Sequence, residues 1–342
     1  MLRLRHLAIG LLPLLLVACG ASSTPAPAPA SAPTPAPTAP AKPKLVAITQ
    51  LVQHPSLDLV RQGVLDGLKA AGFEDGKNIK VDYQNAQGDM AMTKTVADKF
   101  VAETPDIIIT LTTPSAQAVA KAVQNTRIPM IFSTVSDPVG AQLLGSVDQA
   151  SGTNITGVYN FDPTRAQLDL FAQIMPDLKT LGVIYNPGES NSVSTVKRMK
   201  DDIAKRSGWK LVEAPANSSA EVQTAAQSLI GRVQAIYMPQ DNTVVSAFDA
   251  LLKVAQTGKT PLFVSDAQSV GRGAIATVGS DEYKGGVQAG AMAARVLKGE
   301  DPGKVKPEVT ETRHIFINSK AADAFGIKLP DDVKKVGEEQ GK

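Results

Sequence analysis

Residues 106–117 read DIIITLTTPSAQ, and the character of the chain changes in the middle of this stretch. The apolar run from Ile107 to Leu111 is short and rich in β-branched residues, which is typical of a strand buried in a parallel sheet. Hydroxyl residues and a proline follow, and then an alanine-rich helical pattern begins. Because threonine is a good N-cap and proline is favoured in the first turn, we expect Thr113 to cap a helix that starts at Pro114. The stretch predicts a strand, a tight turn and a helix, which is the repeating unit of an open α/β sheet.

The same alternation of apolar runs and helical patterns continues on both sides of this stretch. Up to residue 160, strands are expected at 45–49, 79–83, 107–111 and 128–132, with helices at 57–71, 90–102 and 116–123. The pattern then restarts, with strands expected at 180–185, 210–213, 235–238, 262–264 and 274–278 and helices at 164–174, 192–205, 220–230 and 244–256. A helix at about 286–297 and an apolar run at 315–317 follow.

Strands separated by helices in this way favour parallel sheets that are covered on both faces, so the predicted fold class is α/β. We expect two doubly wound parallel-sheet lobes joined by a hinge. The N-terminal lobe is assigned to residues 44–160 with part of 281–312, and the C-terminal lobe to residues 161–280 with part of 313–342.

The N-terminus has the features of a secretion signal. It starts with basic residues, and the apolar run from Leu7 to Val17 is too short to span a bilayer as a permanent helix. Residues 16–19 read LVAC, which resembles the lipobox of bacterial lipoproteins, in which the cysteine is acylated and becomes the new N-terminus. We therefore expect a signal peptide at 1–18, lipidation at Cys19 and an Ala/Pro-rich linker at 19–43 that does not fold. An ordinary cleaved signal followed by an unmodified cysteine is the alternative. The folded part is expected outside the cytoplasm, in the periplasm or at the cell surface, anchored to a membrane by its lipid.

Composition and missing motifs exclude several functional classes. The chain has 342 residues, of which 43% are hydrophobic, enough for two domains with real cores. A net charge of +2 gives no reason to expect a nucleic-acid partner, and a single cysteine excludes an internal disulfide. Dinucleotide-binding, Walker and Gly-x-Ser-x-Gly motifs are absent, as is any Cys/His cluster with metal-binding spacing. We therefore expect no catalysis, no cofactor and no bound metal.

The residues at the ends of the predicted strands are mostly polar and uncharged or acidic. In open parallel sheets, ligands bind outside the carboxyl ends of the strands, so these residues form the predicted ligand site. Its members are His54, Thr113, Ser115, Ala116, Asp137, Glu189, Asn191, Ser192, Asp241, Asn242 and Asp266.

Within this set the residue types suggest two complementary subsites. The helix after Thr113 would present free N–H groups, and together with the hydroxyls of Thr113 and Ser115 these can hold a carboxylate. Asp241 and Asp266 would be partly desolvated at strand ends, where a carboxylate prefers a cationic partner such as an ammonium group. Ordinary helix capping is the alternative role for Thr113 and for Asp241. An anion cradle with ammonium acceptors is what a zwitterionic amino acid needs.

Several longer phrases make the resemblance to a known family specific. They include HPSLD at 54–58, TPSAQ at 113–117, SDPVG at 136–140, YNPGESNS at 185–192 and DNT at 241–243. With these phrases, which lie between residues 45 and 330, the chain resembles ABC-importer solute-binding proteins of the tryptophan/tyrosine-binding type, which have the type I periplasmic-binding fold. Ser190 departs from the alanine that is frequent at that position.

The resemblance implies a monomeric Venus-flytrap protein without enzymatic activity. It would bind a small ligand between its lobes, with an amino acid expected and tryptophan or tyrosine favoured, and deliver it to a membrane permease with a cytoplasmic ATPase. A sensory protein that reports the same ligand to a membrane receptor is the alternative. The aromatic residues that could contact such a ligand also fit core positions; they are Phe132, Tyr159, Phe161, Tyr185 and Tyr237.

Overall fold

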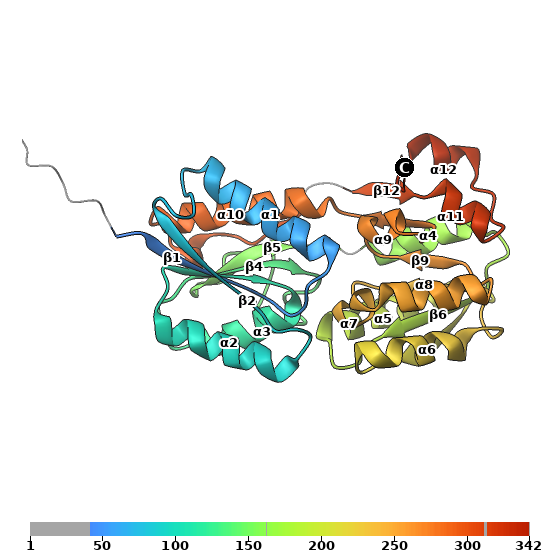
Figure 1. The fold of residues 1–342 in the computed structure, drawn as a ribbon, viewed down its shortest axis with the longest axis horizontal. Helices are drawn as coiled ribbons and strands as arrows, with labels where there is room; N and C mark the ends of the chain where they lie inside the picture. The colour runs from blue at the N-terminus through green and yellow to red at the C-terminus, as the bar shows by residue number, and fades with distance from the viewer. Residues whose placement is uncertain (1–41, 162, 311–312, 342) are drawn as a thin grey trace, which may run out of the picture. The chain divides into compact units, whose positions relative to one another are not determined.

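The computed structural model describes residues 42–161, 163–310 and 313–341. The predicted signal peptide, the predicted lipidation site Cys19 and the linker up to residue 41 lie outside the described residues. The described part consists of two α/β lobes, each built on a parallel sheet, as expected from the sequence (Figure 1).

The first lobe contains a six-stranded sheet in the order β11-β5-β4-β3-β1-β2, and all neighbouring strands are parallel. Its strands are β1 (Lys44–Gln50), β2 (Ile79–Asn85), β3 (Ile107–Leu111), β4 (Met130–Val135), β5 (Ile155–Tyr159) and β11 (Glu308–Val309). Every residue of β3 is buried, because this strand lies in the middle of the sheet and is covered on both faces.

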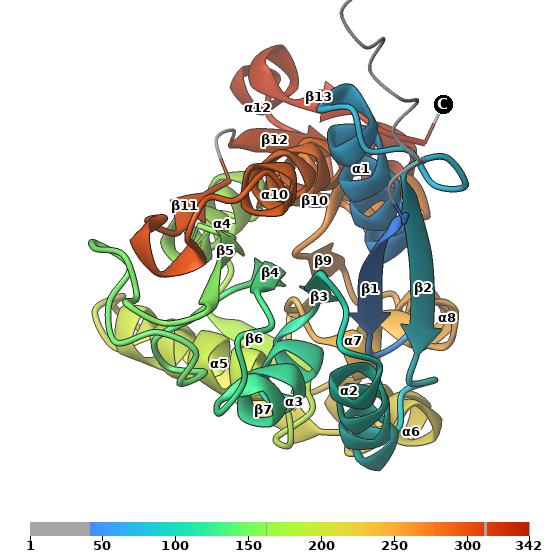
Figure 2. The same cartoon turned by 90° about the vertical axis from the view of Figure 1, so that its left-hand side faces the viewer.

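Two pairs of helices cover the two faces of this sheet (Figures 1 and 2). One pair is α1 (Pro55–Ala70) and α10 (Glu282–Leu297), and its apolar residues form one hydrophobic cluster with the sheet. The other pair is α2 (Met90–Glu103) and α3 (Thr113–Val123), which form a second cluster on the opposite face. The sheet is therefore doubly wound.

Glycines allow α1 and α10 to pack unusually closely. A Cβ atom at Gly63 would lie 2.2 Å from the Tyr283 carbonyl oxygen, and one at Gly286 would lie 2.2 Å from the Val60 carbonyl oxygen. No side chain larger than hydrogen fits at either position without moving a helix. This contact holds α10 in the first lobe although it follows the second lobe in sequence.

The second lobe is built on the parallel sheet β7-β6-β8-β9. Its strands are β6 (Thr180–Tyr185), β7 (Lys210–Pro215), β8 (Ala235–Met238) and β9 (Leu262–Val264). One face packs against α4 (Thr164–Ile174) and α5 (Ser190–Ile203). The other face packs against α6 (Val222–Leu229), the short α7 (Asn242–Ser246), α8 (Phe248–Thr257) and α9 (Ala267–Gly271).

A small mixed sheet completes this lobe and departs from the purely parallel prediction. It consists of β10 (Ala276–Gly279), β12 (His314–Ile317) and β13 (Glu338–Glu339), and β10 pairs with β12 in antiparallel fashion. The remaining short elements are η1 (Ser219–Glu221), η2 (Pro302–Lys304), α11 (Ser319–Ala324) and α12 (Asp331–Val336).

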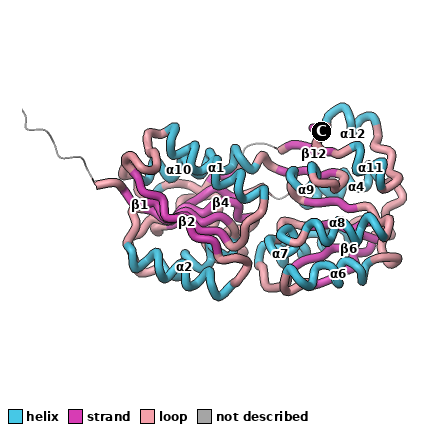
Figure 3. The backbone as a smooth tube through the Cα atoms, viewed as in Figure 1, coloured by secondary structure: helices cyan, strands magenta, loops and turns pink. Residues whose placement is uncertain are grey.

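The chain passes between the lobes after β5, after β10 and after β11; Figure 3 distinguishes the helices, strands and loops of the two lobes. The connections after β10 and β11 are tied together, since the Ser280 and Thr310 hydroxyl oxygens lie 3.0 Å apart. They place α10 and β11 with the first sheet and β12 with the second lobe.

Several predicted boundaries differ from the structure for identifiable reasons. Helix α3 begins at Thr113 and its N-cap is Thr112, so the predicted cap is one residue too late. The helix expected at 244–256 is divided into α7 and α8 at Ala247. Helix α10 begins four residues before the predicted start, because the Asp281 side chain accepts a hydrogen bond from the Lys284 N–H and caps the helix there. Strand β5 was not expected.

Candidate functional site

A cavity lies where the carboxyl ends of both parallel sheets meet. It contains about 730 Å³ that protein atoms do not fill, part of it open to solvent. The first lobe and its connections contribute His54, Ser56, Leu57, Val60, Thr112, Thr113, Ser133, Thr134, Ser136, Asn160, Ser280, Asp281, Glu282, Gly285 and Thr310, and the second lobe contributes Asn191, Gln240, Asp241, Asn242, Val245, Ser265 and Asp266. The lining residues include four carboxylic acids and, among the described residues, neither lysine nor arginine.

The start of α3 presents hydrogen-bond donors to this cavity. Thr112 has φ 109° and ψ 150°, a conformation that a β-branched residue rarely adopts, and it turns the chain from β3 directly into the helix. Thr113 is 2% exposed, and its hydroxyl has no hydrogen-bond partner among the described residues. The first N–H groups of a helix also lack partners within the helix. Ser115 and Ala116 are buried and do not line the cavity; the Ser115 hydroxyl accepts from Thr112, and the Ala116 N–H donates to the Thr112 carbonyl.

Asp266 presents an unpaired hydrogen-bond acceptor, which suits a ligand group that donates hydrogen bonds. Its Oδ1 accepts from the Ser269 N–H at 2.9 Å, which caps α9, and from the Ser56 hydroxyl of the first lobe, also at 2.9 Å. Its Oδ2 is buried and has no partner in the described protein. The same is true of Asn191 Oδ1, while the Asn191 amide donates to the Gln240 carbonyl at 2.8 Å. A buried oxygen without a donor is costly, so both atoms favour a ligand that donates hydrogen bonds.

Asp241 also lines the cavity, but each of its oxygens already has a donor from the backbone. Oδ2 accepts from the Asn186 N–H at 2.5 Å, and Oδ1 accepts from the Val244 N–H at 2.9 Å, which caps α7. Burial, and next the charge of Glu189, raise the pKa of Asp241 to about 7 against the effect of these hydrogen bonds. The capping alternative is thus present in the structure, and the ammonium role of Asp241 stays a prediction.

Glu189 and its neighbours support the site from behind. The Glu189 carboxylate is fully buried and accepts hydrogen bonds from the N–H and side chain of Asn242 and from the N–H and hydroxyl of Thr243. It therefore holds the start of α7, and it does not line the cavity. Ser192 is likewise buried and accepts from the Asn191 amide at 3.3 Å. Asn242 does line the cavity.

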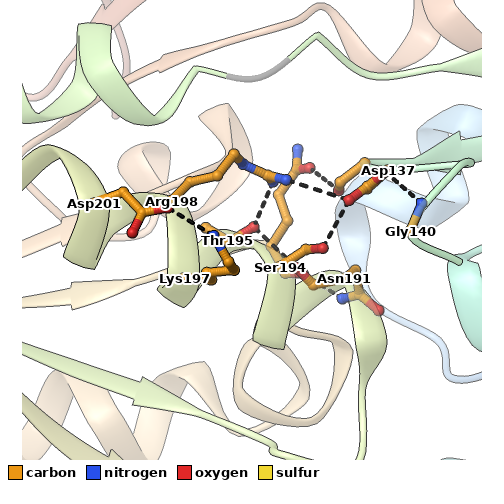
Figure 4. A network of polar contacts seen from close by, with 10 residues as sticks. Asp137, Gly140, Asn191, Ser194, Thr195, Lys197, Arg198 and Asp201 are labelled. Atoms are coloured by element: carbon orange, nitrogen blue, oxygen red, sulfur yellow. Dashed lines mark hydrogen bonds and ion pairs between the residues drawn. The ribbon is translucent and has the colours of Figure 1, made fainter.

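Asp137 connects the two lobes beside the cavity (Figure 4). One carboxylate oxygen accepts from the Ser194 hydroxyl at 2.7 Å and lies 3.6 Å from the Arg198 guanidinium, both on α5 of the second lobe. The other accepts from the Gly140 N–H at 2.7 Å. Asp137 is absent from the cavity lining, so its predicted role in ligand binding is not supported by its position.

Further hydrogen bonds join the lobes around the cavity. The Gln240 side-chain oxygen accepts from the Ser136 hydroxyl at 3.0 Å and from the Asn160 amide at 3.1 Å. The Ser190 hydroxyl donates to the Gln117 side chain at 3.2 Å. The lobes are therefore closed over the cavity.

His54 brings no positive charge to the cavity. Its Nδ1 accepts from the Leu57 N–H at 3.4 Å and caps α1. Burial lowers the pKa of His54 below its ordinary value, against the attraction of Asp266, so the ring is neutral at neutral pH.

Sequence reasoning missed Glu282, which lines the cavity. Burial, and then the charges of Asp266 and Asp281, raise the pKa of Glu282 to about 8. The polar residues 280–282 follow the strand predicted at 274–278 after a single glycine, and the strand-end rule applied there would have identified Glu282.

The aromatic residues considered from the sequence lie outside the cavity lining. Tyr237 packs with Phe171 in the core of the second lobe, and its hydroxyl donates to Gln167. Phe132 is fully buried, and the Tyr185 hydroxyl donates to Glu213. Apolar surface in the cavity comes from Leu57, Val60 and Val245 instead.

The described residues contain neither a candidate metal site nor a helix that could span a membrane. Residues 42–161, 163–310 and 313–341 contain no group of three or more His, Cys, Asp or Glu side chains that could hold a metal ion. Within these ranges, no helix is both long and apolar enough to cross a membrane.

Residues 45–340 match the model of the family described as ABC transporter substrate binding protein. Over 297 residues the chain is 38% identical to a tyrosine-binding protein of Clostridioides difficile (strain R20291), covering 86% of this chain and 85% of that protein. A solved ABC domain from Streptococcus pneumonia in complex with L-Trp is 32% identical, with a TM-score of 0.83 over 87% of this chain and 100% of that one. The ligand-free, open structure of a substrate-binding protein with adhesive properties from Clostridium difficile is 36% identical, with a TM-score of 0.64 and the same coverage.

The two TM-scores also bear on how the lobes are arranged. The open structure has the higher sequence identity to this protein but the lower TM-score. Sequence divergence therefore does not account for the difference between the two TM-scores. The structure of this protein is thus more similar to the L-Trp complex than to the open structure, in agreement with the hydrogen bonds that join its lobes. Proteins of this kind are extracytoplasmic, bind a small molecule without converting it, and act with an ABC transporter. With the cavity at the ends of both sheets and a family match over residues 45–340, the chain belongs to the ABC transporter substrate-binding proteins.

Proposed function

We propose that this protein is the monomeric, lipid-anchored binding component of an ABC importer, and that its ligand is an α-amino acid, with tryptophan or tyrosine favoured. The observation that carries the proposal is a pair of unsatisfied groups that line one cavity, one from each lobe. Asp266 Oδ2 and the Thr113 hydroxyl are buried without partners. Asp266 Oδ2 needs a hydrogen-bond donor. The Thr113 hydroxyl, at the N-terminal end of α3, can donate a hydrogen bond to an anion. The names of the relatives, one tyrosine-binding and one solved with L-Trp, favour an aromatic side chain.

The two ends of a zwitterion fit these groups. The α-ammonium group would donate to Asp266 Oδ2 and to Asn191 Oδ1, which are the unpaired acceptors of the second lobe. The α-carboxylate would accept from the Thr113 hydroxyl and from N–H groups at the start of α3, which has 11 residues and a corresponding dipole. Because the cavity is lined by acids and by no described lysine or arginine, amino acids with an acidic side chain are disfavoured.

Calorimetric titration with truncated ligands tests this assignment. L-tyrosine and L-tryptophan should bind, whereas L-glutamate should not. Tyramine lacks the carboxylate and N-acetyl-L-tyrosine lacks the ammonium group, so each should lose most of the affinity if both subsites act. Binding of tyramine as tight as that of L-tyrosine would refute the carboxylate subsite. If neither aromatic amino acid produces heat, the ligand class is wrong.

Anchoring and delivery are tested separately in cells. The lipobox-like residues 16–19 support lipidation at Cys19. A Cys19→Ala variant should leave the membrane fraction and still bind ligand after purification, whereas retention of the variant through high-salt washing would contradict the anchor. Deletion of the gene should abolish high-affinity uptake of labelled L-tyrosine, and restored uptake with the wild-type gene but not with Cys19→Ala would support both roles.

A further inference from the structure

Helix α10 contains three glycines, and its packing against α1 explains two of them. A Cβ atom at Gly286 would lie 2.2 Å from a carbonyl oxygen of α1, and one at Gly290 would lie 2.3 Å from another. Gly285 differs. Outside its own helix and its chain neighbours, the one described atom within 4 Å of its Cβ position is Thr310 Cγ2, at 3.3 Å. Among the described residues, no backbone atom therefore excludes a side chain at Gly285.

The missing side chain of Gly285 leaves room in the ligand cavity. Gly285 is buried, and both Gly285 and Thr310 line the cavity. A methyl group added at a buried position would normally meet several atoms, so a single neighbour indicates that the position borders the cavity itself. Glycine inside a helix also costs stability relative to alanine. Because packing against α1 does not require this glycine, we look for its role in the ligand site.

The cavity wall next to Gly285 is apolar. Val60 of α1 lies beside it, since the Val60 carbonyl oxygen faces the neighbouring Gly286. Leu57 lies one turn earlier on α1, and Leu57 and Val60 both line the cavity and are 4% and 1% exposed. We call Leu57, Val60 and Gly285 the α1–α10 wall. It is the larger apolar part of the cavity, because the second lobe contributes only Val245.

The α1–α10 wall begins beside the proposed ammonium subsite. Ser56, which directly precedes Leu57, donates to Asp266 Oδ1 at 2.9 Å, and Oδ2 of the same carboxylate is the proposed acceptor of the ammonium group. We propose that the α1–α10 wall receives the aromatic side chain of the ligand, and that Gly285 determines specificity by leaving room for a large ring. The inference rests on the proposed function, because it takes an aromatic amino acid as the ligand.

Gly285→Ala fills part of this room with one methyl group. Alanine favours a helix more than glycine does, and the new Cβ would meet only the end of the Thr310 side chain, so the variant should melt at the wild-type temperature or above. Overpacking of the ligand site should weaken L-tryptophan by about 5- to 150-fold. L-tyrosine has the smaller ring and should lose less affinity. Calorimetric titration and thermal denaturation of the same samples measure these effects.

Gly271→Ala is the matched control. Gly271 is the last residue of α9 and is absent from the cavity lining. Its Cβ would lie 3.9 Å from Gln340 Cβ, which is an ordinary contact distance. This variant should therefore bind both amino acids as the wild-type protein does.

The outcomes separate this inference from the proposed function. Wild-type affinity for L-tryptophan in Gly285→Ala would refute the role of Gly285 and leave the amino-acid assignment intact. An equal loss for L-tryptophan and L-tyrosine would also refute it, because the methyl group would then crowd the part that both ligands share. A melting temperature well below that of wild type would show that packing requires Gly285, as it requires Gly286, and would overturn the inference at that step. If the wild-type protein binds neither amino acid, the proposed ligand is wrong, and this inference with it.

Discussion

Replacement of Asp266 by asparagine tests which carboxylate receives the ligand's ammonium group. Asparagine keeps Oδ1, so the bonds from the Ser269 N–H and from Ser56 can persist and α9 remains capped. The unpaired Oδ2 is replaced by an NH₂ group, which offers a donor where the ammonium also donates. Loss of one partner of a desolvated charged hydrogen bond costs about 2–5 kcal/mol, or roughly 30- to several-thousand-fold in affinity.

Asp241→Asn is the informative counterpart, because Asp241 receives one backbone N–H on each oxygen. Asparagine can accept only one of them, from Asn186 or from Val244, and the other N–H is left buried against an NH₂ group. An unsatisfied buried group costs about 1–3 kcal/mol, so this variant should melt at a lower temperature. If Asp241 is a cap alone, its affinity should stay near that of wild type. If Asp241 instead accepts a hydrogen bond from the ligand's ammonium group, as predicted from the sequence, Asp241→Asn should bind L-tyrosine weakly with little change in stability.

Calorimetric titration with L-tyrosine and thermal denaturation of the same samples distinguish these cases. Asp249→Asn serves as the control, because Asp249 is exposed on the same lobe and, among the described residues, pairs with Arg272. An Asp266→Asn protein that is folded and binds L-tyrosine within about threefold of wild type would refute the ammonium assignment to Asp266. If the Asp249→Asn control also binds L-tyrosine more weakly, the loss of affinity in Asp266→Asn reflects the change in net charge and not a contact with the ammonium group.

Three further predictions follow from the packing and charges. Gly286→Ala should lower the melting temperature strongly, because its Cβ would lie 2.2 Å from a backbone oxygen of α1, at a cost of about 1–3 kcal/mol or more; an unchanged melting temperature would contradict the close packing. Ser194→Ala should weaken L-tyrosine and L-tryptophan equally, by about 2- to 12-fold, because it removes a bond between lobes outside the cavity; a change confined to one ligand would contradict this. Burial raises the pKa of Glu282 from 4.5 to about 8. Its contribution to the stability of the ligand-free protein is therefore present below pH 4.5 and is lost as pH rises through 8. Between pH 5 and pH 8, the free energy of unfolding should fall less in Glu282→Gln than in the wild-type protein.

The parts of the fold that depend on local pattern could be predicted from the sequence. The strands at 107–111, 180–185, 235–238 and 262–264 were placed without error, because short apolar runs between helical patterns define buried parallel strands. The position of α10 could not be predicted in this way. It depends on the fit of glycines such as Gly286 against α1, more than 200 residues earlier, and no local pattern reports that contact.

The candidate site was predicted at the level of strand ends but not of side-chain direction. His54, Thr113, Asn191, Asp241, Asn242 and Asp266 line the cavity, as the rule for parallel sheets suggests. Glu189 and Asn191 are two residues apart, yet one side chain supports the start of α7 from behind and the other faces the cavity. Which of two neighbours points inward depends on the turn geometry and on distant partners, and Thr112 shows how unusual that geometry can be.

Asp266 joins ligand binding to lobe closure through its two oxygens. When the lobes are apart, water can hydrate both of them. In the closed arrangement Ser56 of the first lobe satisfies Oδ1, while Oδ2 is buried and has no donor within the described protein. An unsatisfied buried group costs about 1–3 kcal/mol, and more when it is charged, which corresponds to roughly 5- to 150-fold in favour of the open form. A ligand that donates to Oδ2 removes this penalty in the closed form only, and a ligand shifts a conformational equilibrium by such a difference between states. The same carboxylate can thus keep the lobes open without an amine and closed with one.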